Sequence, residues 1–174
     1  MRLHLLVTLI LTACLLSCGG GSGTQPAEPT ESTPPAPSKP LGSCSLLTAD
    51  EVKTIMGADA KPNESGAAST VSNCTWVTES GSGLGIMVRQ ATSAGEAEAV
   101  YANAISQSQG LSGVAPQNMP GFGDKAYWAG GNLKQLNVFK GNYWVIISVF
   151  AAGKDKDPLA LAKAAAEKAI PRLP

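Results

Sequence analysis

Histidine is almost absent from this chain, because the only one is His4. It lies in an N-terminal segment that we expect to be removed, which would leave the mature chain without a histidine base or a histidine metal ligand. No serine lies in a nucleophile-elbow pattern, no Ser-x-x-Lys motif occurs, and no two carboxylates form an obvious acid–base pair. We therefore expect no catalytic residue, no metal site, no cofactor and no enzymatic activity.

Excess charge of one sign and long hydrophobic runs are also lacking. The formal net charge is zero at pH 7, and loss of Arg2 with the N-terminal segment would make it slightly negative. No basic stripe is present, which excludes nucleic acid as an expected partner. The apolar run from Leu3 to Leu16 covers about 14 residues, fewer than the roughly 20 that a transmembrane helix needs, and no later run is long enough.

That apolar run is instead typical of a bacterial lipoprotein signal peptide, because it follows Arg2 and precedes Ser17 and Cys18. We expect residues 1–17 to be removed and Cys18 to carry lipid chains such as palmitate, which hold the protein on a cell membrane or outer membrane, facing outside the cytoplasm. A simple secretory peptide and a buried N-terminal helix are the alternatives. Cys14 ends a second lipobox-like string, but cleavage there would leave a very short apolar region.

Residues 18–43 form a tether in this interpretation. They begin glycine-rich and become rich in proline, threonine and serine, with almost no large apolar side chain. Such a composition cannot offset the entropy cost of ordering, so we expect a disordered spacer between the lipidated cysteine and a single folded domain at 44–174.

Two cysteines, Cys44 and Cys74, would remain in that domain. Pairs of cysteines in exported domains usually form disulfides, and this one would join the start of the domain to its first predicted strand. A zinc site is the alternative, but it would need further ligands, and the domain has neither histidine nor another thiol.

Helix signals occur three times. Thr48 and Glu51 form a capping box that predicts a helix over about 49–56, and Ser93 and Glu96 form a second one that predicts a helix ending near Gly110. The second helix has an apolar stripe: Ala97, Val100, Tyr101, Ala104 and Ile105. Asp157-Pro158 opens the last helix, which we expect to end near Ile170.

The remaining pattern predicts strands over 71–78, 84–90, 125–129, 133–140 and 143–151. Irregular chain is expected at 58–69, and a loop with glycine and proline is expected from the end of the second helix to about Gly123. Gly141-Asn142 is a two-residue hairpin signal. The strand at 143–151 is apolar on both faces, which places it centrally. The predicted fold class is α+β, an antiparallel sheet of about five strands with helices packed on one face, in the order α-β-β-α-β-β-β-α.

The string from Pro120 to Asp124 is the most distinctive one. We interpret this string as a tight turn that enters a strand, with Asp124 bonding local N–H groups. The alternative is that Gly121 and Asp124 form one rim of a binding groove. Trp128 and Trp144 lie on strands that could be adjacent. They either pack in the core or lie on an open sheet face, where they could contact a partner or an apolar ligand.

Three sets of residues resemble a family of small cell-envelope lipoproteins of unknown function, familiar from actinobacteria. They are Cys44-Ser45-Leu46-Leu47-Thr48 with Glu51-Val52 and Gly57, then Cys74-Thr75-Trp76, then Gly121-Phe122-Gly123-Asp124-Lys125-Ala126-Tyr127. The alanine-rich last helix is also similar. The resemblance covers most of the folded domain and implies a lipid-anchored α+β domain with a disulfide. It implies no activity.

Two functions are consistent with the sequence. The first is a non-enzymatic interaction module of the cell envelope, which binds a protein or polymer through an open sheet face. The second is a small-ligand or lipid-binding lipoprotein with an internal pocket between helices and sheet. A large exposed apolar patch would favour the first function, and a closed apolar cavity would favour the second.

Overall fold

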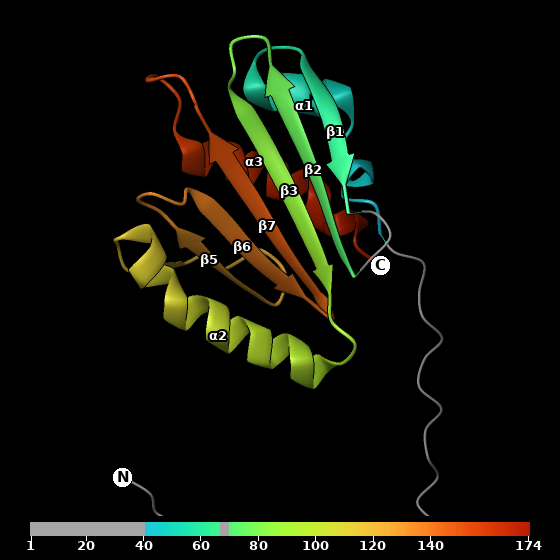
Figure 1. The fold of residues 1–174 in the computed structure, drawn as a ribbon, viewed down its shortest axis with the longest axis vertical. Coiled ribbons are helices and arrows are strands. Elements are labelled where there is room, and N and C mark those ends of the chain that lie inside the picture. The colour runs from blue at the N-terminus through green and yellow to red at the C-terminus, as the bar shows by residue number, and fades with distance from the viewer. Residues whose placement is uncertain (1–40, 67–69) are drawn as a thin grey trace, which may run out of the picture. The chain divides into compact units, whose positions relative to one another are not determined.

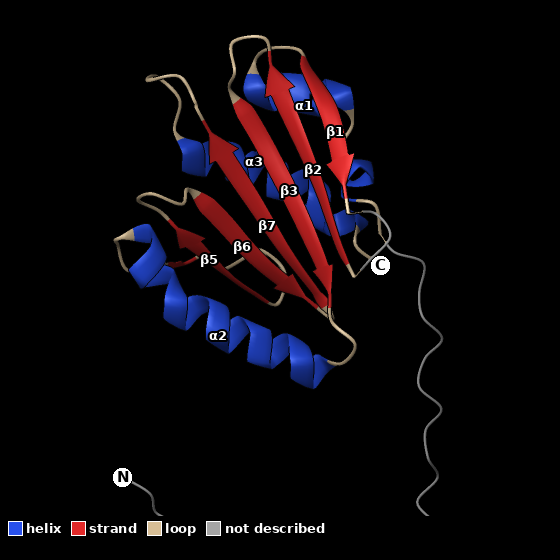
Figure 2. Cartoon of the chain, viewed as in Figure 1, coloured by secondary structure: helices blue, strands red, loops and turns tan. Residues whose placement is uncertain are grey.

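The computed structural model describes residues 41–66 and 70–174. The expected signal peptide, Cys18 and all but the last three residues of the expected tether lie outside the described residues. The described part is an α+β domain with a seven-stranded antiparallel sheet and three α-helices (Figures 1 and 2). None of these described helices is both long and apolar enough to cross a membrane.

The helices are α1 (Ala49–Met56), α2 (Ala94–Ser112) and α3 (Pro158–Ala169), with short 3₁₀ turns at Ser43–Leu46 and Ile170–Arg172. The strands are β1 (Ala60–Ser65), β2 (Val71–Thr78), β3 (Gly83–Gln90), β4 (Gln117–Asn118), β5 (Lys125–Ala129), β6 (Gln135–Lys140) and β7 (Tyr143–Phe150). They lie side by side in the order β1-β2-β3-β7-β6-β5-β4. The apolar strand β7 is therefore central, as its sequence predicts.

The expected strand count of about five and the expected element order are wrong. The structure adds β1 and β4, so three strands precede α2 and four follow it. Strand β1 contains Pro62 and Glu64, and all its residues after Ala60 are exposed. It lies at the edge of the sheet, where backbone pairing with β2 holds it and no apolar face is needed. Strand β4 has only two residues, too few to carry a pattern.

The expectation that all helices pack on one face of the sheet is also wrong. Helices α1 and α3 cover one face, where Val52 and Ala166 pack in the same core as Ile147. Helix α2 covers β5 and β6 on the opposite face, where Tyr101 packs against Tyr127 and Phe139 (Figure 1). We call these the α1/α3 face and the α2 face. The reason is that β6 is buried on both sides, which requires a cover on each.

Local capping explains where the helices begin. Thr48 accepts a hydrogen bond from the Glu51 N–H at 3.3 Å, and the Glu51 carboxylate accepts one from the Thr48 N–H at 2.9 Å, which confirms the first capping box. At α2 the second box is incomplete, because the Glu96 carboxylate bonds the N–H of Thr92. This helix continues to Ser112 and ends at Gly113, which adopts a positive φ of 78°.

Three long-range links hold the start of the domain. Cys44 and Cys74 lie at disulfide distance, with their Cα atoms 5.0 Å apart, and join the first 3₁₀ turn to β2. Ser43, the last residue of the expected tether, is buried, and its N–H donates to the Ser72 hydroxyl at 2.9 Å. Arg172 forms a two-pronged ion pair with Glu51, at 2.7 and 2.8 Å. The C-terminal turn is therefore tied to α1.

Candidate functional site

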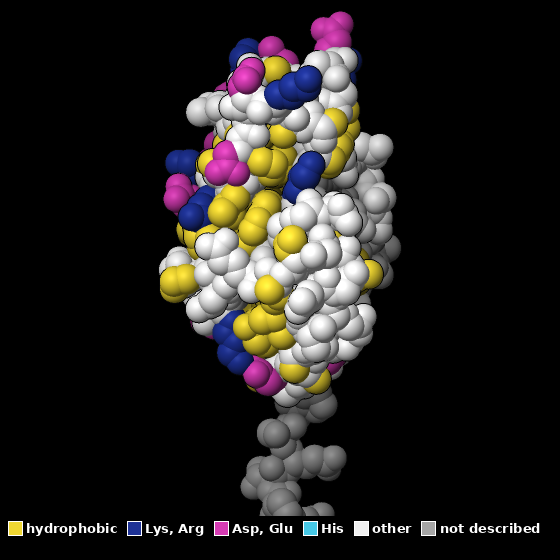
Figure 3. Space-filling view, turned by 90° about the vertical axis from the view of Figure 1, so that its left-hand side faces the viewer, with side chains coloured by type: hydrophobic (Ala, Val, Ile, Leu, Met, Phe, Trp, Pro, Cys, Tyr) yellow, Lys and Arg dark blue, Asp and Glu magenta, His cyan; other side chains and the backbone are white. Residues whose placement is uncertain are grey.

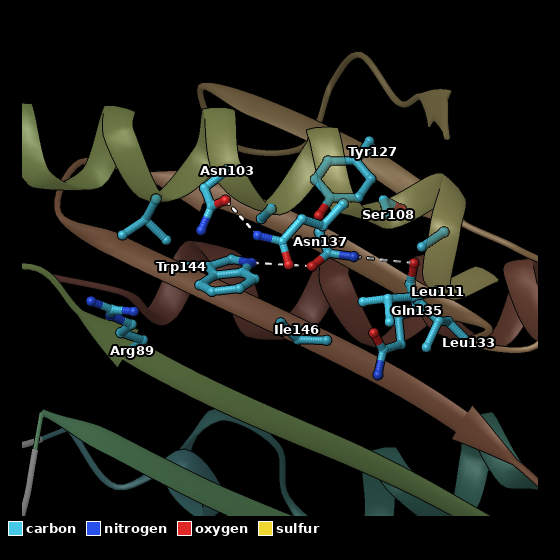
Figure 4. Close-up of a pocket in the computed structure, with 14 residues that line it drawn as sticks. Arg89, Asn103, Ser108, Leu111, Tyr127, Leu133, Gln135, Asn137, Trp144 and Ile146 are labelled. Carbon is cyan, nitrogen blue, oxygen red and sulfur yellow. Dashed lines mark hydrogen bonds between the residues drawn. The ribbon is translucent and has the colours of Figure 1, made fainter. Parts of the chain in front are cut away.

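A half-open cleft of about 280 Å³ lies on the α2 face, between α2 and strands β3 and β7 (Figure 4). We call it the α2 cleft. The side chains that line it include Arg89, Asn103, Gln107, Ser108, Tyr127, Gln135, Asn137, Trp144 and Ile146. Helix α2 forms one wall, and β6 and β7 form the floor. The cleft exists because α2 covers β5 and β6 but stops short of β3.

Strands β6 and β7 supply an amphipathic floor. Their hairpin register places Phe139 opposite Trp144 and Asn137 opposite Ile146, so all four side chains lie on the α2 face. The Trp144 ring stacks on Phe139, with centroids 5.5 Å apart, and its indole N–H donates to the Asn137 side-chain oxygen at 3.1 Å. This orients the ring at the floor of the cleft (Figure 4).

Amide side chains dominate the polar part of the lining. Asn137 and Gln135 lie on β6, and Asn137 is only 2% exposed. Asn103 and Gln107 lie on α2, where the Gln107 amide donates to the Asn103 side-chain oxygen at 2.6 Å. An amide can donate and accept hydrogen bonds at once, so this set can bond a ligand with mixed donors and acceptors.

Ser108 is the most unusual group in the cleft. It lies on α2, one turn beyond Ala104, and is 3% exposed. Its hydroxyl is buried and has no hydrogen-bond partner within the described residues. A buried polar atom without a partner costs about 1–3 kcal/mol, and native proteins rarely keep one without a reason. A polar ligand in the cleft would supply the partner.

The α2 cleft carries little net charge. Its only charged lining residue is Arg89, which pairs with Glu96 at 3.0 Å. The Thr92 hydroxyl and N–H, together with Arg89, lower the pKa of Glu96 to about 2, so this carboxylate is ionised at neutral pH. Burial and the neighbouring Tyr101 raise the pKa of Tyr127 to about 12, so its phenol stays neutral. The cleft is therefore polar without a free charge.

The structure separates the two tryptophans that the sequence suggested as binding residues. Trp144 lies in the α2 cleft. Trp128 lies on the opposite face, partly buried against the core, because its neighbour Tyr127 takes the α2 side of β5. A contact that uses both rings on one surface is therefore excluded by the register.

Gly121 and Asp124 lie in a turn before β5 rather than in the α2 cleft. The Asp124 N–H donates to Phe139 O, and its carboxylate accepts from the Gly141 N–H, both at 2.7 Å. Gly123 has a positive φ of 59°, and a Cβ there would lie 2.5 Å from Phe139 O. These contacts fasten the turn to the β6–β7 hairpin. Asp124 also lines a second half-open groove beside α2, of about 230 Å³.

Beyond the cleft, the α2 face continues over β1, β2 and β3. Val77 and Phe150 are 41% and 38% exposed there, and the Phe150 ring lies where a side chain on Gly83 would be. Figure 3 shows the side of the domain that lies on the left in Figure 1. Hydrophobic side chains form several groups on this side, separated by polar side chains and charges of both signs. That view shows no single broad apolar patch.

Sequence reasoning did not single out Asn137 or Ser108. Asn137 shares a face of its strand with Gln135 and Phe139. The two-residue hairpin signal at Gly141-Asn142 sets the register, which places Asn137 opposite Ile146 and on the same face as Trp144. Ser108 continues the apolar stripe of α2 at helical spacing. A hydroxyl on an apolar stripe is a signal that could have found it.

Within residues 41–66 and 70–174, no three His, Cys, Asp or Glu side chains are grouped so that they could hold a metal ion. No protein-family model matches the chain, and the searches of curated proteins and of solved structures gave no match. The function of the α2 cleft is therefore inferred from its geometry and chemistry.

Proposed function

We propose that this protein is a lipid-anchored, non-catalytic binding module of the bacterial cell envelope, and that the α2 cleft is its binding site. The N-terminal pattern that ends at Cys18 supports the anchor. The cysteine pair at disulfide distance is typical of proteins outside the cytoplasm. The single histidine, His4, and the lack of a recognisable nucleophile or acid–base motif in the sequence support binding over catalysis.

The unpaired hydroxyl of Ser108 in the α2 cleft is the observation that carries this proposal. It lines the same cleft as the buried Asn137 and the floor residues Trp144 and Ile146. Binding sites usually combine apolar walls with a few converging polar groups, and this cleft has that composition.

The properties of the cleft favour a small polar ligand over a lipid. Ligand pockets usually measure about 300–1,000 Å³, so the α2 cleft, at about 280 Å³, lies just below that range. Three of its amide side chains, Asn103, Gln107 and Gln135, reach solvent and would lose hydrogen bonds to water if an acyl chain covered them. A small ligand, or one unit of a polymer, fits the volume and the lining better.

The test compares molecules retained by the full chain after extraction from membranes in mild detergent. Ile146→Trp fills the floor of the cleft. Thr75→Trp is the matched control, because Thr75 lies on the same face two strands away, opposite Gly85. Circular dichroism establishes that each variant is folded, and mass spectrometry identifies the retained molecules.

The proposal predicts a molecule that the wild type and Thr75→Trp retain and Ile146→Trp loses. If all three folded proteins retain the same molecules in the same amounts, the α2 cleft is not the binding site.

A further inference from the structure

We infer that the α2 cleft binds a neutral saccharide unit, an uncharged sugar ring such as a hexose or an N-acetylhexosamine. This inference rests on the proposed function, because it names the ligand class of the same cleft. Four observations carry it: the charge balance of the lining, its hydrogen-bonding groups, its apolar floor and the position of the cleft within the sheet.

The charge balance excludes a strongly ionic ligand. An anionic ligand such as a phosphate or carboxylate is normally held by an unpaired cation, and Arg89 is already engaged by Glu96 at 3.0 Å. A cationic ligand would need an acidic lining residue, and the cleft has none. An uncharged ligand needs neither.

The hydrogen-bonding groups match hydroxyls. Asn103, Gln107 and Gln135 can each donate and accept, and sugar hydroxyls do the same. The bond between Gln107 and Asn103 uses one group of each amide and leaves the Asn103 NH₂ and the Gln107 carbonyl for a ligand. The Ser108 hydroxyl adds a buried group that has no partner. A ring with several hydroxyls could satisfy these groups together.

The floor matches the C–H groups of a sugar ring. Trp144 and Ile146 form an apolar surface on β7, directly across from the polar wall of α2. The stacking on Phe139 and the bond to Asn137 fix the Trp144 ring before any ligand arrives. A ligand with hydroxyls at its rim and C–H groups on its face can therefore contact the polar wall and the apolar floor at once. Because the Trp144 ring is already fixed, binding loses little side-chain entropy at this residue.

The position of the cleft disfavours an extended peptide. Peptides often bind by adding a strand to a free sheet edge. Strands β3, β7 and β6 are interior strands, each paired on both sides, so their backbone groups are already bonded. Recognition here must use side chains, as it does for sugars.

Saturation-transfer NMR on the detergent-extracted full chain tests the inference. The probes are N-acetylglucosamine, glucose, galactose and mannose, with glucosamine and glucuronate as cationic and anionic controls. We expect saturation transfer to at least one neutral sugar, and at least fivefold weaker binding of both charged controls. Ser108→Ala should weaken binding of that sugar about threefold to tenfold, the loss of about one hydrogen bond, while Thr75→Trp should leave it unchanged.

Each other outcome overturns the inference. These outcomes are absence of transfer to every neutral sugar, equal binding of a charged control, and unchanged binding in both Ser108→Ala and Ile146→Trp. If the extracted protein instead retains a molecule of another class that Ile146→Trp loses, the saccharide inference is wrong and the proposed function stands. If Ile146→Trp is unfolded, Ser108→Ala alone decides, because removing an unpaired hydroxyl should not harm the fold.

Discussion

Trp144 on β7 donates its indole N–H to the side-chain oxygen of Asn137 on the neighbouring strand β6, at 3.1 Å. Asn137 is buried, and the same side chain also donates to the backbone oxygen of Gln135 at 3.5 Å. One side-chain bond therefore fixes the aromatic floor of the α2 cleft to its polar lining.

This bond predicts energetic coupling between the two residues. Asn137→Ala leaves the Trp144 N–H without its partner, and Trp144→Phe leaves the Asn137 oxygen without its donor, so each should lower the free energy of unfolding by about 1–3 kcal/mol. Urea titration of both single variants and the double variant gives the coupling. We expect the double variant to lose less than the two single losses added together, and strict additivity would show that the bond contributes nothing.

Ser108→Ala should leave the free energy of unfolding unchanged or raise it by about 1 kcal/mol, because it removes a buried hydroxyl that has no partner. Ser112, on the same helix, is the matched control. It is also buried, but its hydroxyl donates to Val114 O at 2.7 Å. Ser112→Ala should therefore destabilise by about 1 kcal/mol. Equal losses in the two variants would mean that the Ser108 hydroxyl is bonded in the folded protein.

The ion pair at the C-terminus predicts acid sensitivity. The Arg172 guanidinium, with the Thr48 N–H, lowers the pKa of Glu51 from 4.5 to about 2. A carboxylate whose folded pKa is depressed stabilises the fold above its unfolded pKa, and this stabilisation disappears as the pH falls toward the folded pKa. The wild-type Tm should therefore fall between pH 5 and pH 2.

Glu51→Gln should lower the Tm at pH 7 and flatten its fall with acid, because glutamine has no proton to gain. Glu79→Gln, in an exposed turn, is the control and should follow the wild type. Parallel acid curves for Glu51→Gln and wild type would show that this carboxylate does not link α1 to the C-terminal turn.

The cysteine pair predicts an intramolecular disulfide. Intact-mass measurement should show that the oxidised protein lacks two hydrogens relative to the reduced form. Because the two residues are 30 apart in sequence, Cys44→Ser with Cys74→Ser should lower the free energy of unfolding by about 3–4 kcal/mol. Two freely alkylatable thiols in unreduced, unfolded protein would contradict the bond.

Lipid attachment is predicted at Cys18. Cys18→Ser should release the protein from the membrane pellet in high salt, because the mature chain would then lack its acyl anchor. Cys14→Ser is the matched control, four residues earlier in the same apolar segment, and should stay membrane-bound. Release by Cys14→Ser and retention of Cys18→Ser would move the attachment site to Cys14.

Elements with a strong local signal were predictable from the sequence. The capping box at Thr48 and Glu51 predicted α1 within its observed bounds, and the alternation at 71–78 and 125–129 predicted β2 and β5 within theirs. Strand β1 was not predictable, because its exposed residues carry no apolar period and only pairing with β2 makes them a strand. A strand that is held by backbone hydrogen bonds alone needs no particular side chains, so its sequence does not reveal it.

The candidate site was predictable in one residue only. Trp144 was suggested by its position on an apolar strand, but the cleft around it depends on which face α2 covers, and a helix stripe does not specify a face. The apolar stripe of α2 fits either side of the sheet. The packing of Tyr101 against Tyr127 and Phe139 determines which face α2 covers, and this contact forms only once the strands are assembled into the sheet.

The most direct test of the α2 cleft uses the three tryptophans of the chain, Trp76, Trp128 and Trp144. Each indole N–H gives its own signal in a ¹⁵N-correlated NMR spectrum. Trp144 lies in the cleft, whereas Trp76 and Trp128 pack on the opposite face of the sheet. On titration with N-acetylglucosamine and the other neutral sugars, we predict that the Trp144 indole signal and the Asn137 side-chain amide signals shift while the other two indole signals stay in place. Shifts confined to Trp76 or Trp128, or a sugar that binds without moving the Trp144 signal, would contradict a binding site in the α2 cleft.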